Sequence, residues 1–355
     1  MDRYLFILYE HQYTHFLAYH SDYLASHAGA QVEVLCIDRD YGASRRGFLD
    51  LFRVAFLIAM RYRNDPGIHV ITITPKGGAI GALLRSLGIF KKQTHWFTGQ
   101  VWATSTGVVR LLKKLPDQLT ALAADRILCD SIPQREFLLE NGFTWATSKM
   151  AVPAFGSICG IDDALFAEGS PWSKAFDASI VQVGIVGRVN EDKGFSWFIA
   201  NFPELETSNL QFHIYGTIDG NLDFEKKFLE FVAANADLVI FHGEERNLSK
   251  IYSGIDILLN LSYREGFSNV MIESQSYGVP IIARDIYAIK TSFSIGVSGE
   301  LFNDADTLNE KLSLYRDSSV RQLAGKRGYS FVESRFRRSH VLAAIYAYYT
   351  EKTFG

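Results

Sequence analysis

The chain has 355 residues, of which 48% are hydrophobic, 21% charged and 14% aromatic. This composition is that of a folded globular protein, and it excludes a disordered chain, a collagen and a disulfide-dense miniprotein, while the length favours about two domains. The net charge is −3, yet residues 41–116 hold twelve Lys or Arg against two acids, a net +10, which indicates an anionic partner for this part or, alternatively, a solvated basic face.

Apolar, β-rich runs alternate with helical-period segments through the first half, a pattern typical of parallel α/β domains. The runs predict six strands, at 4–9, 32–37, 69–74, 94–97, 126–129 and 149–152. No signal peptide is recognisable in the opening residues, and the apolar stretch at 54–60 is far shorter than the roughly 20 residues of a membrane-spanning helix. We therefore expect neither export nor a transmembrane helix.

Residues 45–63 predict a helix with one apolar face and cations at both ends. Such a helix suits the interface of an anionic membrane, although a helix buried in the first domain explains the pattern equally well. The segment TPKGGAIGALLRSLG at 74–88 predicts a strand, a glycine turn and a helix. The turn would let the backbone approach an anion beside Lys76, or it would only permit close packing.

Three cysteines, Cys36, Cys129 and Cys159, are widely spaced and lack the pairing of a zinc site, so we expect reduced thiols in a reducing compartment. After the second strand, Asp38 and Asp40 imitate a two-carboxylate metal motif. We do not assign a metal there, because the cations described below already serve bound phosphates. The nine histidines are dispersed, and no other metal constellation is present in the sequence.

The second half repeats the alternating pattern, with strands predicted at 181–186, 211–215, 238–241, 257–261 and 280–283. Residues 160–180 lack periodicity and form the expected boundary between domains. We place an N-terminal domain at 1–165 and a second domain at 166–335. The tail at 320–354 is predicted to be helical, and its last part, 336–355, is expected to pack back on the N-terminal domain. Two such domains would hold a ligand in the cleft between them.

Two cations, Arg188 and Lys193, follow the strand at 181–186, next to Gly187 and Gly194. Doubly wound sheets bind ligands at the carboxyl ends of their strands, and this pair of charges suits a diphosphate. Two surface cations without a ligand are the alternative.

The segment EGFSNVMIE places Glu265 and Glu273 around a predicted helix start. The N–H groups of Gly266, Phe267, Ser268 and Asn269 would favour bound phosphate. Eight residues of helix separate the carboxylates by roughly 12 Å, close to the span of a nucleotide sugar whose hydroxyls they would accept. The structural alternative makes Glu265 a partner of the helix dipole and Glu273 a surface residue.

The spacing G-R-x4-K at 187–193, followed by E-x7-E at 265–273 and GVPII at 278–282, resembles the donor half of retaining glycosyltransferase family 4, of GT-B fold. TPKGG at 74–78, HWFTGQVWATSTG at 95–107 and FGSICGID at 155–162 are similar to bacterial capsule and O-antigen transferases that extend undecaprenyl-diphosphate sugars. The family often has a glycine-rich loop after its first strand, where this chain has YEHQYTH at 9–15. The resemblance implies two Rossmann-like domains, the first for the acceptor and the second for the donor.

The resemblance also implies a role for each matching residue. Arg188 and Lys193 would hold the donor diphosphate, Glu265 would contact the donor sugar, and His95 would lie beside the reacting sugar. The remaining donor contacts would be Gly187, the backbone at 266–269 and Glu273, which would take the ribose hydroxyls. The acceptor diphosphate would meet Lys76, Gly77, Gly78, Thr98 and Gly99. A core histidine satisfied by backbone is the alternative for His95.

The expected reaction transfers a hexose, N-acetylated or deoxy, from a UDP-sugar to an undecaprenyl-diphosphate-linked sugar, with retention and without a metal or other cofactor. The expected partners are this donor, the lipid-linked acceptor and an anionic membrane surface, and no nucleic acid. Such a protein would be cytoplasmic and peripheral on the inner face of the membrane. A UDP-sugar epimerase of the same fold and an inactive sugar-nucleotide-binding protein are the alternatives.

Overall fold

The computed structural model describes residues 2–43, 49–65, 67–167 and 179–350. The chain forms two compact units. The first unit contains the residues up to Gly160 together with those from Arg338 onward, and the second contains Ile161–Arg337. Each unit is built around its own parallel sheet, so the fold class expected from the alternating pattern is confirmed.

The first sheet has six strands in the order β2-β1-β3-β4-β5-β6, and every pairing is parallel. All six predicted strands are present, within two residues of their expected bounds: β1 (Arg3–Leu8), β2 (Gln31–Cys36), β3 (His69–Ile73), β4 (Lys92–Phe97), β5 (Arg126–Cys129) and β6 (Met150–Ala151). The central strands β1 and β3 are almost entirely buried, as expected where helices cover both faces of a parallel sheet.

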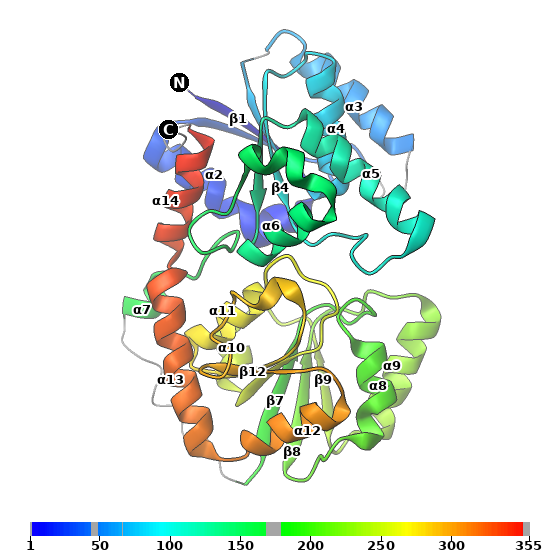
Figure 1. Cartoon of the computed structure of the whole chain (residues 1–355), viewed down its shortest axis with the longest axis vertical. Helices are drawn as coiled ribbons and strands as arrows, with labels where there is room; N and C mark the ends of the chain where they lie inside the picture. Colours follow the sequence, from blue (N-terminus) through cyan, green and yellow to red (C-terminus); the bar gives the residue numbers. More distant parts are fainter. Residues whose placement is uncertain (1, 44–48, 66, 168–178, 351–355) are drawn as a thin grey trace. The chain divides into compact units, whose positions relative to one another are not determined.

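The helices of the first unit include two groups that pack together, one made of α3, α4 and α5 and the other of α2 and α14. Helix α3 packs on α4 and α4 on α5, while α14 lies beside α2 (Figure 1). The bounds are α1 (Glu10–Gln12), α2 (Ala18–Ala28), α3 (Leu49–Tyr62), α4 (Thr74–Ser86), α5 (Gly107–Ala123), α6 (Ile132–Leu138) and α14 (Arg338–Tyr349), with short 3₁₀ or π segments η1 (Tyr13–Leu17), η2 (Leu139–Phe143) and η3 (Thr144–Lys149).

The tail is two helices rather than the single predicted one. Helix α13 (Ser318–Arg335) ends before Phe336, whose side chain is fully buried and whose carbonyl accepts a hydrogen bond from the N–H of Ile161 at 2.7 Å. Helix α14 then enters the core of the first unit. Its Ile345 is buried with Phe6, and the ring of Tyr349 lies 6.2 Å from that of Tyr4.

The second sheet also has six parallel strands, in the order β12-β11-β10-β7-β8-β9. They are β7 (Val181–Val186), β8 (Leu210–Tyr215), β9 (Val239–Gly243), β10 (Ile257–Asn260), β11 (Ile281–Arg284) and β12 (Gly299–Phe302). The sequence analysis missed β12, because GELF is short and carries a glycine and an acid in place of a β-branched apolar run.

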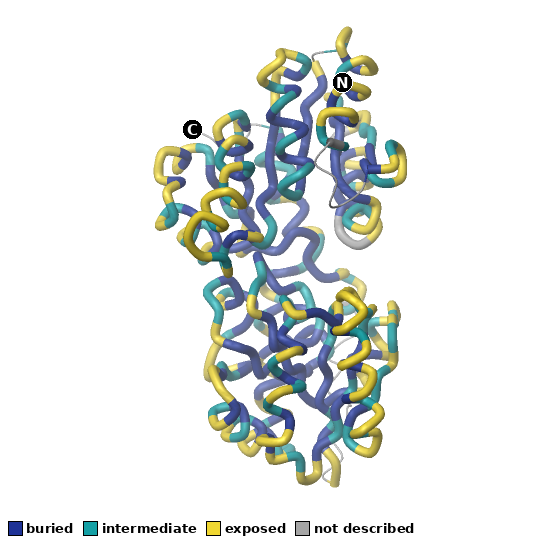
Figure 2. The backbone as a smooth tube through the Cα atoms, turned by 90° about the vertical axis from the view of Figure 1, so that its right-hand side faces the viewer, coloured by how far each residue is buried: buried dark blue, intermediate teal, exposed yellow. Residues whose placement is uncertain are grey.

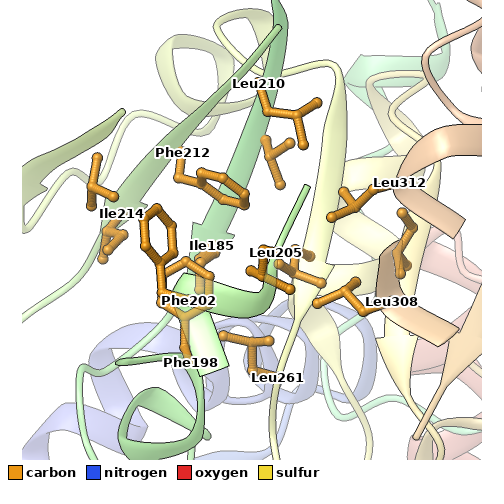
Figure 3. Packing of buried hydrophobic residues seen from close by; sticks show 14 of the residues in the cluster. Ile185, Phe198, Phe202, Leu205, Leu210, Phe212, Ile214, Leu261, Leu308 and Leu312 are labelled. Carbon is orange, nitrogen blue, oxygen red and sulfur yellow. The ribbon is translucent and has the colours of Figure 1, made fainter. Parts of the chain in front are cut away.

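The helices of the second unit are α7 (Ala164–Ala167), α8 (Phe195–Asn201), α9 (Leu222–Ala234), α10 (Leu248–Ser253), α11 (Asn269–Ser276), α12 (Ala305–Leu314) and α13, with η4 (Phe202–Glu204) and η5 (Tyr287–Ile289). An aromatic core joins α8 and η4 to the sheet: the ring of Phe212 on β8 lies 5.4 Å from that of Phe198 on α8 and 5.6 Å from that of Phe202 on η4 (Figure 3). In both units the strands are the buried part and the helices carry most exposed positions (Figure 2). No helix in the described part of the chain is long and apolar enough to cross a membrane.

The packing of α14 predicts a destabilisation confined to the first unit. Replacing Ile345, which is 1% exposed, with Ala leaves a cavity and should cost that unit about 2–5 kcal/mol. Hydrogen exchange should show faster exchange at the amides of β1 and β3, with β7 and β10 unchanged. The matched control, Leu323→Ala on the exposed side of α13, should alter neither unit. Loss of protection in β7 and β10 alone would contradict this assignment of α14.

Candidate active site

Two strands of the second sheet end in glycines that bring their backbones into close contact. Gly187 follows β7 with a φ of 139°, and Gly216 follows β8 with a φ of 153°, conformations that side chains rarely adopt. A Cβ at Gly216 would lie 1.9 Å from the carbonyl oxygen of Gly187. A larger residue at Gly216 therefore cannot be accommodated without moving the carboxyl edge of the sheet, where parallel α/β sheets bind ligands, whereas at Gly187 the backbone conformation alone disfavours one.

The loop after β7 packs closely against the residue that follows β10. Gly194 has a φ of 79°, and a Cβ there would lie 2.1 Å from the carbonyl oxygen of Leu261. The Asn190 side chain accepts a hydrogen bond from the N–H of Lys193 at 3.0 Å, which fixes the turn. The sequence motif thus forms a tight turn followed by α8, as expected for a strand that leads into a helix.

Lys193 and Glu265 form an ion pair, with Nζ 2.5 Å from Oε1. Their side chains are only 22% and 12% exposed, so both charges are partly removed from water. A second pair joins the same loops, because Arg264 lies 2.5 Å from Asp192. Lys193 was expected at the diphosphate of the donor and Glu265 at its sugar, and the structure brings the two side chains together.

Arg188 pairs with a different carboxylate from the one that Lys193 contacts. Its guanidinium lies 2.5 Å from the carboxylate of Asp219, and the two side chains are about half exposed, at 51% and 47%. Because solvent screens such a pair, its contribution to stability is small and Arg188 can exchange Asp219 for an anionic ligand at low cost. Both cations nevertheless come from the same short loop at the carboxyl end of β7.

The segment EGFSN leads into α11, which begins at Asn269 with Ser268 as its N-cap. Phe267 is buried and packs on Phe336, so its side chain anchors the loop. The expectation that the N–H groups of 266–269 all point out of the helix start is wrong for Ser268, because its N–H donates to the Ser292 hydroxyl at 3.5 Å. Helix α11 starts four residues after Glu265, so Glu265 lies in the loop before the helix, as expected, and only the second half of the interval to Glu273 is helical.

Glu273, on α11, is oriented by a residue that the sequence analysis missed. Tyr252 on α10 donates its hydroxyl to Oε2 of Glu273 at 3.0 Å. Burial raises the pKa of Tyr252 well above its ordinary value, and the neighbouring carboxylate adds to the effect, so the tyrosine stays a donor. Glu273 is therefore a positioned, half-buried carboxylate, not the free surface residue of the structural alternative.

Arg284, at the end of β11, is a second residue that the sequence analysis missed. Its guanidinium lies 4.3 Å from the ring centre of Trp197, 4.6 Å from Tyr263 and 5.0 Å from Phe302. Its Nε donates to the carbonyl of Leu261 at 3.1 Å, on the segment that leads to Glu265. Burial lowers the pKa of Arg284, and we interpret it as a positioning residue for this loop.

In the first unit, His95 is buried in β4, and its Nδ1 lies 2.9 Å from the hydroxyl of Thr72. Burial lowers the pKa of His95 to about 3, and the hydrogen bond with Thr72 opposes this shift only in part. The ring is therefore neutral near pH 7. His95 lines a small pocket with Thr74, Pro75, Trp96, Phe97, Thr98, Gly99, Gln100 and Asp117.

The structure corrects the role expected for the glycines of TPKGG. The strand β3 ends at Ile73 and α4 begins at once, so Gly77 and Gly78 lie buried inside the helix and form no glycine turn. A Cβ at Gly78 would lie 2.6 Å from Cε1 of His95 and 2.7 Å from the Thr120 side chain. These glycines allow α4 to approach the sheet and α5. Lys76 is half-buried on α4, and burial lowers its pKa.

The acceptor residues Thr98 and Gly99 follow β4 and line the His95 pocket. The carbonyl of Thr98 accepts hydrogen bonds from the side-chain amides of Gln100 and Gln134, at 2.7 and 2.6 Å. A strained residue, Thr74, lies on the same pocket with a φ of 70°, and its hydroxyl accepts from the N–H of Gly77. Backbone strain in a β-branched residue of this kind is concentrated at functional sites.

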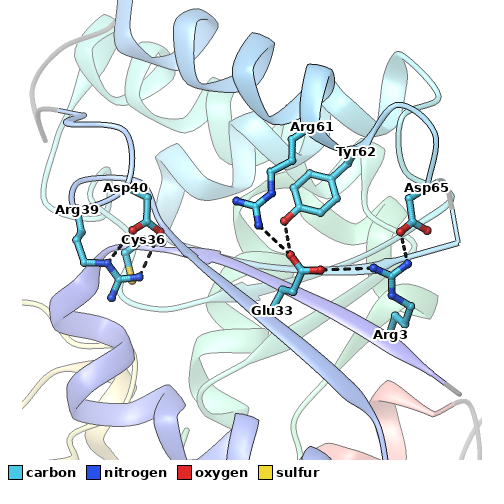
Figure 4. Close-up of polar contacts among 8 residues, drawn as sticks. All are labelled: Arg3, Glu33, Cys36, Arg39, Asp40, Arg61, Tyr62 and Asp65. Atoms are coloured by element: carbon cyan, nitrogen blue, oxygen red, sulfur yellow. Dashed lines mark hydrogen bonds and ion pairs between the residues drawn. The ribbon is translucent and has the colours of Figure 1, made fainter.

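The carboxylates of 38–40 are used within the protein. Asp40 accepts the N–H of Cys36 at 2.9 Å and pairs with Arg39 (Figure 4). Asp38 accepts the N–H of Glu10. Among the residues that the structure describes, no group of three or more His, Cys, Asp or Glu is arranged to hold a metal ion.

Comparison with known proteins places these features in a family context. The model of the family "Glycosyl transferases group 1" matches residues 181–316. Residues 181–316 are therefore similar to group 1 glycosyltransferases, over less than half of the chain. This match contains Arg188, Lys193, Glu265 and Glu273, and thus all of the charged positions assigned to the donor.

Relatives extend the likeness beyond residues 181–316. The capsular polysaccharide biosynthesis glycosyltransferase CapM of Staphylococcus aureus is 24% identical over 299 residues, which cover 81% of this chain and 78% of CapM. Two solved structures each cover 99% of this chain: sucrose-phosphate synthase from Thermosynechococcus elongatus, with 19% identity, 99% coverage and a TM-score of 0.80, and Anabaena Alr3699/HepE in complex with UDP, with 15% identity, 100% coverage and a TM-score of 0.73. The chain therefore has the two-domain GT-B fold.

The buried carboxyl of Asp117 predicts a pH-dependent stability. Burial raises the pKa of Asp117 to about 6, although a hydrogen bond from the Trp102 indole partly opposes the shift. The folded pKa of Asp117 exceeds the unfolded value near 3.9. The free energy of unfolding of the protein therefore falls as the pH rises from about 4 to about 6, by on the order of 3 kcal/mol.

An Asp117→Asn variant keeps an acceptor for Trp102 and removes the titration. In urea unfolding, the free energy of unfolding of the variant minus that of the unaltered protein should therefore increase between pH 4.5 and pH 7. Equal differences at both pH values would contradict a raised pKa at Asp117.

Proposed function

We propose that the protein transfers a hexose, N-acetylated or deoxy, from a UDP-sugar to a hydroxyl of an undecaprenyl-diphosphate-linked sugar, in the synthesis of a bacterial surface polysaccharide. The observation that carries this proposal is the ion pair of Lys193 with Glu265 at the carboxyl edge of the second sheet, inside the region that is similar to group 1 glycosyltransferases. It is supported by the structural neighbour that was crystallised with UDP and by the relative named for capsular polysaccharide biosynthesis.

The donor diphosphate is the group that this edge suits. Arg188 is half exposed and pairs with Asp219, and Lys193 is close by in sequence on the same loop. A diphosphate that displaces Asp219 would meet both cations, which then stabilise the negative charge that develops on the leaving group. Because two cations and a helix start serve the phosphates, we propose that transfer needs no metal ion.

The proposed reaction retains the configuration of the sugar. The carboxylate of Glu265 is already committed to Lys193, so it is suited to orient the donor sugar while its charge supports the ammonium. We assign no covalent nucleophile and infer front-face attack, with the leaving diphosphate oxygen taking the proton of the acceptor hydroxyl. Glu273, fixed by Tyr252, would accept the ribose hydroxyls.

The acceptor would bind on the first unit. His95 is neutral, so its proposed role is a hydrogen bond to a sugar hydroxyl rather than protonation by an imidazolium. Lys76, Thr98 and Gly99 remain the proposed contacts of the acceptor diphosphate, whereas Gly77 and Gly78 serve packing. The lipid chain of such an acceptor implies a cytoplasmic protein that is peripheral on the inner face of the membrane, with an anionic lipid surface as a partner of the first unit.

A panel of UDP- and GDP-sugars tests the function, with nucleotide release measured in the presence of EDTA and with or without an undecaprenyl-diphosphate sugar. We expect release of UDP that depends on the acceptor and survives EDTA, with a product of retained configuration. Release of an epimer without acceptor would replace the transferase with an epimerase. Binding of UDP-sugar without turnover under any acceptor would leave only a sugar-nucleotide-binding protein.

Substitutions at the charged edge should separate catalysis from folding. Arg188→Ala and Glu265→Ala should each lower kcat at least about a hundredfold, the scale for removing one preorganised charge partner. The matched control is Lys226→Ala on α9, which breaks an exposed pair with Glu230 and should leave kcat unchanged. Near-normal turnover of both edge variants, with circular dichroism unchanged, would refute the assignment.

A double-substitution cycle on Lys193 and Glu265 tests whether they act as a unit. Each single change to Ala leaves a partly buried charge without its partner, so the double variant should lose clearly less than the product of the two single losses. Losses in kcat that multiply would show that the two residues act independently.

A further inference from the structure

Helix α5 exposes a continuous apolar stripe to solvent. The positions recur at the helical spacing of three or four residues, so they share one side of the 17-residue helix. Their exposed fractions are high, at 70% for Val108, 66% for Leu111 and Leu112, 49% for Leu115, 53% for Leu119 and 64% for Leu122. A stripe of six large aliphatic residues is far more than the scattered apolar exposure of an ordinary surface.

The opposite side of α5, which faces the protein, carries the polar residues Asp117 and Thr120 together with the small residue Ala121. Asp117 is buried and accepts the Trp102 indole N–H at 2.8 Å, and the charged ends of Arg110 and Lys114 each lie 5.5 Å from the ring centre of Trp102. Thr120 is buried where α4 approaches through Gly78. An amphipathic helix usually turns its large apolar side chains toward the protein, whereas α5 turns them toward solvent. The contacts of Asp117, Arg110 and Lys114 with Trp102 stabilise this orientation.

Helix α3 adds exposed apolar side chains to the same helical layer. Phe56 is 64% and Met60 49% exposed, and both share the outer side of the helix with Arg53. The inner side is anchored, since Tyr62 donates its hydroxyl to Glu33 at 2.7 Å (Figure 4). The described part of the segment 45–63 thus has features of both interpretations made from its sequence, a packed face and an exposed apolar face.

We propose that α5 lies flat in the interface of an anionic lipid bilayer, with its apolar stripe inserted among the acyl chains. Charged residues along its length, Arg110, Lys113, Lys114 and Asp117, are incompatible with a spanning helix and compatible with an interfacial one. The net +10 of residues 41–116, which include α3, α4 and the first half of α5, supplies the complementary charge.

Charge also decides against a second copy of the chain as the occupant. A symmetric dimer through α5 would bring two +10 segments together, which costs free energy, whereas an anionic bilayer is attracted by them. The proposal specifies the element by which the membrane partner proposed above is bound. The proposal rests on the anionic membrane proposed above as a partner, and it does not depend on the proposed transfer reaction, because binding to vesicles is measured without donor or acceptor.

The test is flotation of the full chain with vesicles of phosphatidylcholine alone and with about one-third phosphatidylglycerol. We expect binding to the anionic vesicles, weakened at least about tenfold by the triple change Leu111→Gln, Leu115→Gln and Leu119→Gln. The matched control, Leu222→Gln, Leu229→Gln and Leu323→Gln, alters exposed leucines of the second unit that are 82%, 44% and 49% exposed, and it should bind as the unaltered protein does.

A second measurement reports insertion directly. An environment-sensitive dye on Leu112→Cys should shift to the blue on anionic vesicles, and the same dye on Leu222→Cys should not. The three native cysteines are buried, which favours labelling at the introduced position.

Three results would overturn the proposal: no binding of the unaltered chain to anionic vesicles, equal loss of binding in both triple variants, or a dimer that forms without lipid and is abolished by the α5 changes. A failed transfer assay alongside normal vesicle binding would refute the proposed chemistry and leave this proposal standing.

Discussion

All strands of a parallel sheet deliver their carboxyl ends to one edge, and the candidate donor site depends on this constraint. The loops after β7 and β10 are far apart in sequence, yet they meet because the two strands are neighbours in the sheet. Lys193 and Glu265 then form their ion pair across that junction. The glycines at the ends of β7 and β8, the close approach of Gly194 to Leu261 and the aromatic cage of Arg284 all hold the same edge in shape.

The strands and the charged motif residues could be predicted from the sequence, because both leave local signals. Eleven of the twelve strands in the described residues were predicted, and β12 was missed because GELF is short and carries a glycine and an acid. Pairings between distant residues leave no such signal. Nothing in the local pattern around Tyr252 indicates that its hydroxyl meets Glu273, and nothing around Arg284 indicates three aromatic neighbours from different elements.

TPKGG and α5 show how a correct pattern can lead to a wrong environment. The glycines after β3 were expected in a phosphate-binding turn, and they lie in a helix because Thr74 adopts a left-handed φ that lets α4 begin directly at the end of the strand. The periodicity of α5 correctly indicates an amphipathic helix, and periodicity alone does not say which side faces inward. Here the hydrogen bond from Trp102 to Asp117 and the close packing of α4 against Thr120 turn the polar side of α5 toward the protein.

The position of α14 in the chain has a consequence for the order of folding during synthesis. The first unit is nearly complete once Gly160 is made, but Tyr4, Phe6 and His20 still lack the helix that packs on them until residues 338–349 emerge. The second unit, by contrast, is one continuous segment whose first residue, Ile161, donates a hydrogen bond to the carbonyl of Phe336 near its end. Synthesis of the first unit therefore begins before that of the second unit and ends after it. Until α14 is made, the apolar surface of the first unit that α14 covers stays exposed to solvent.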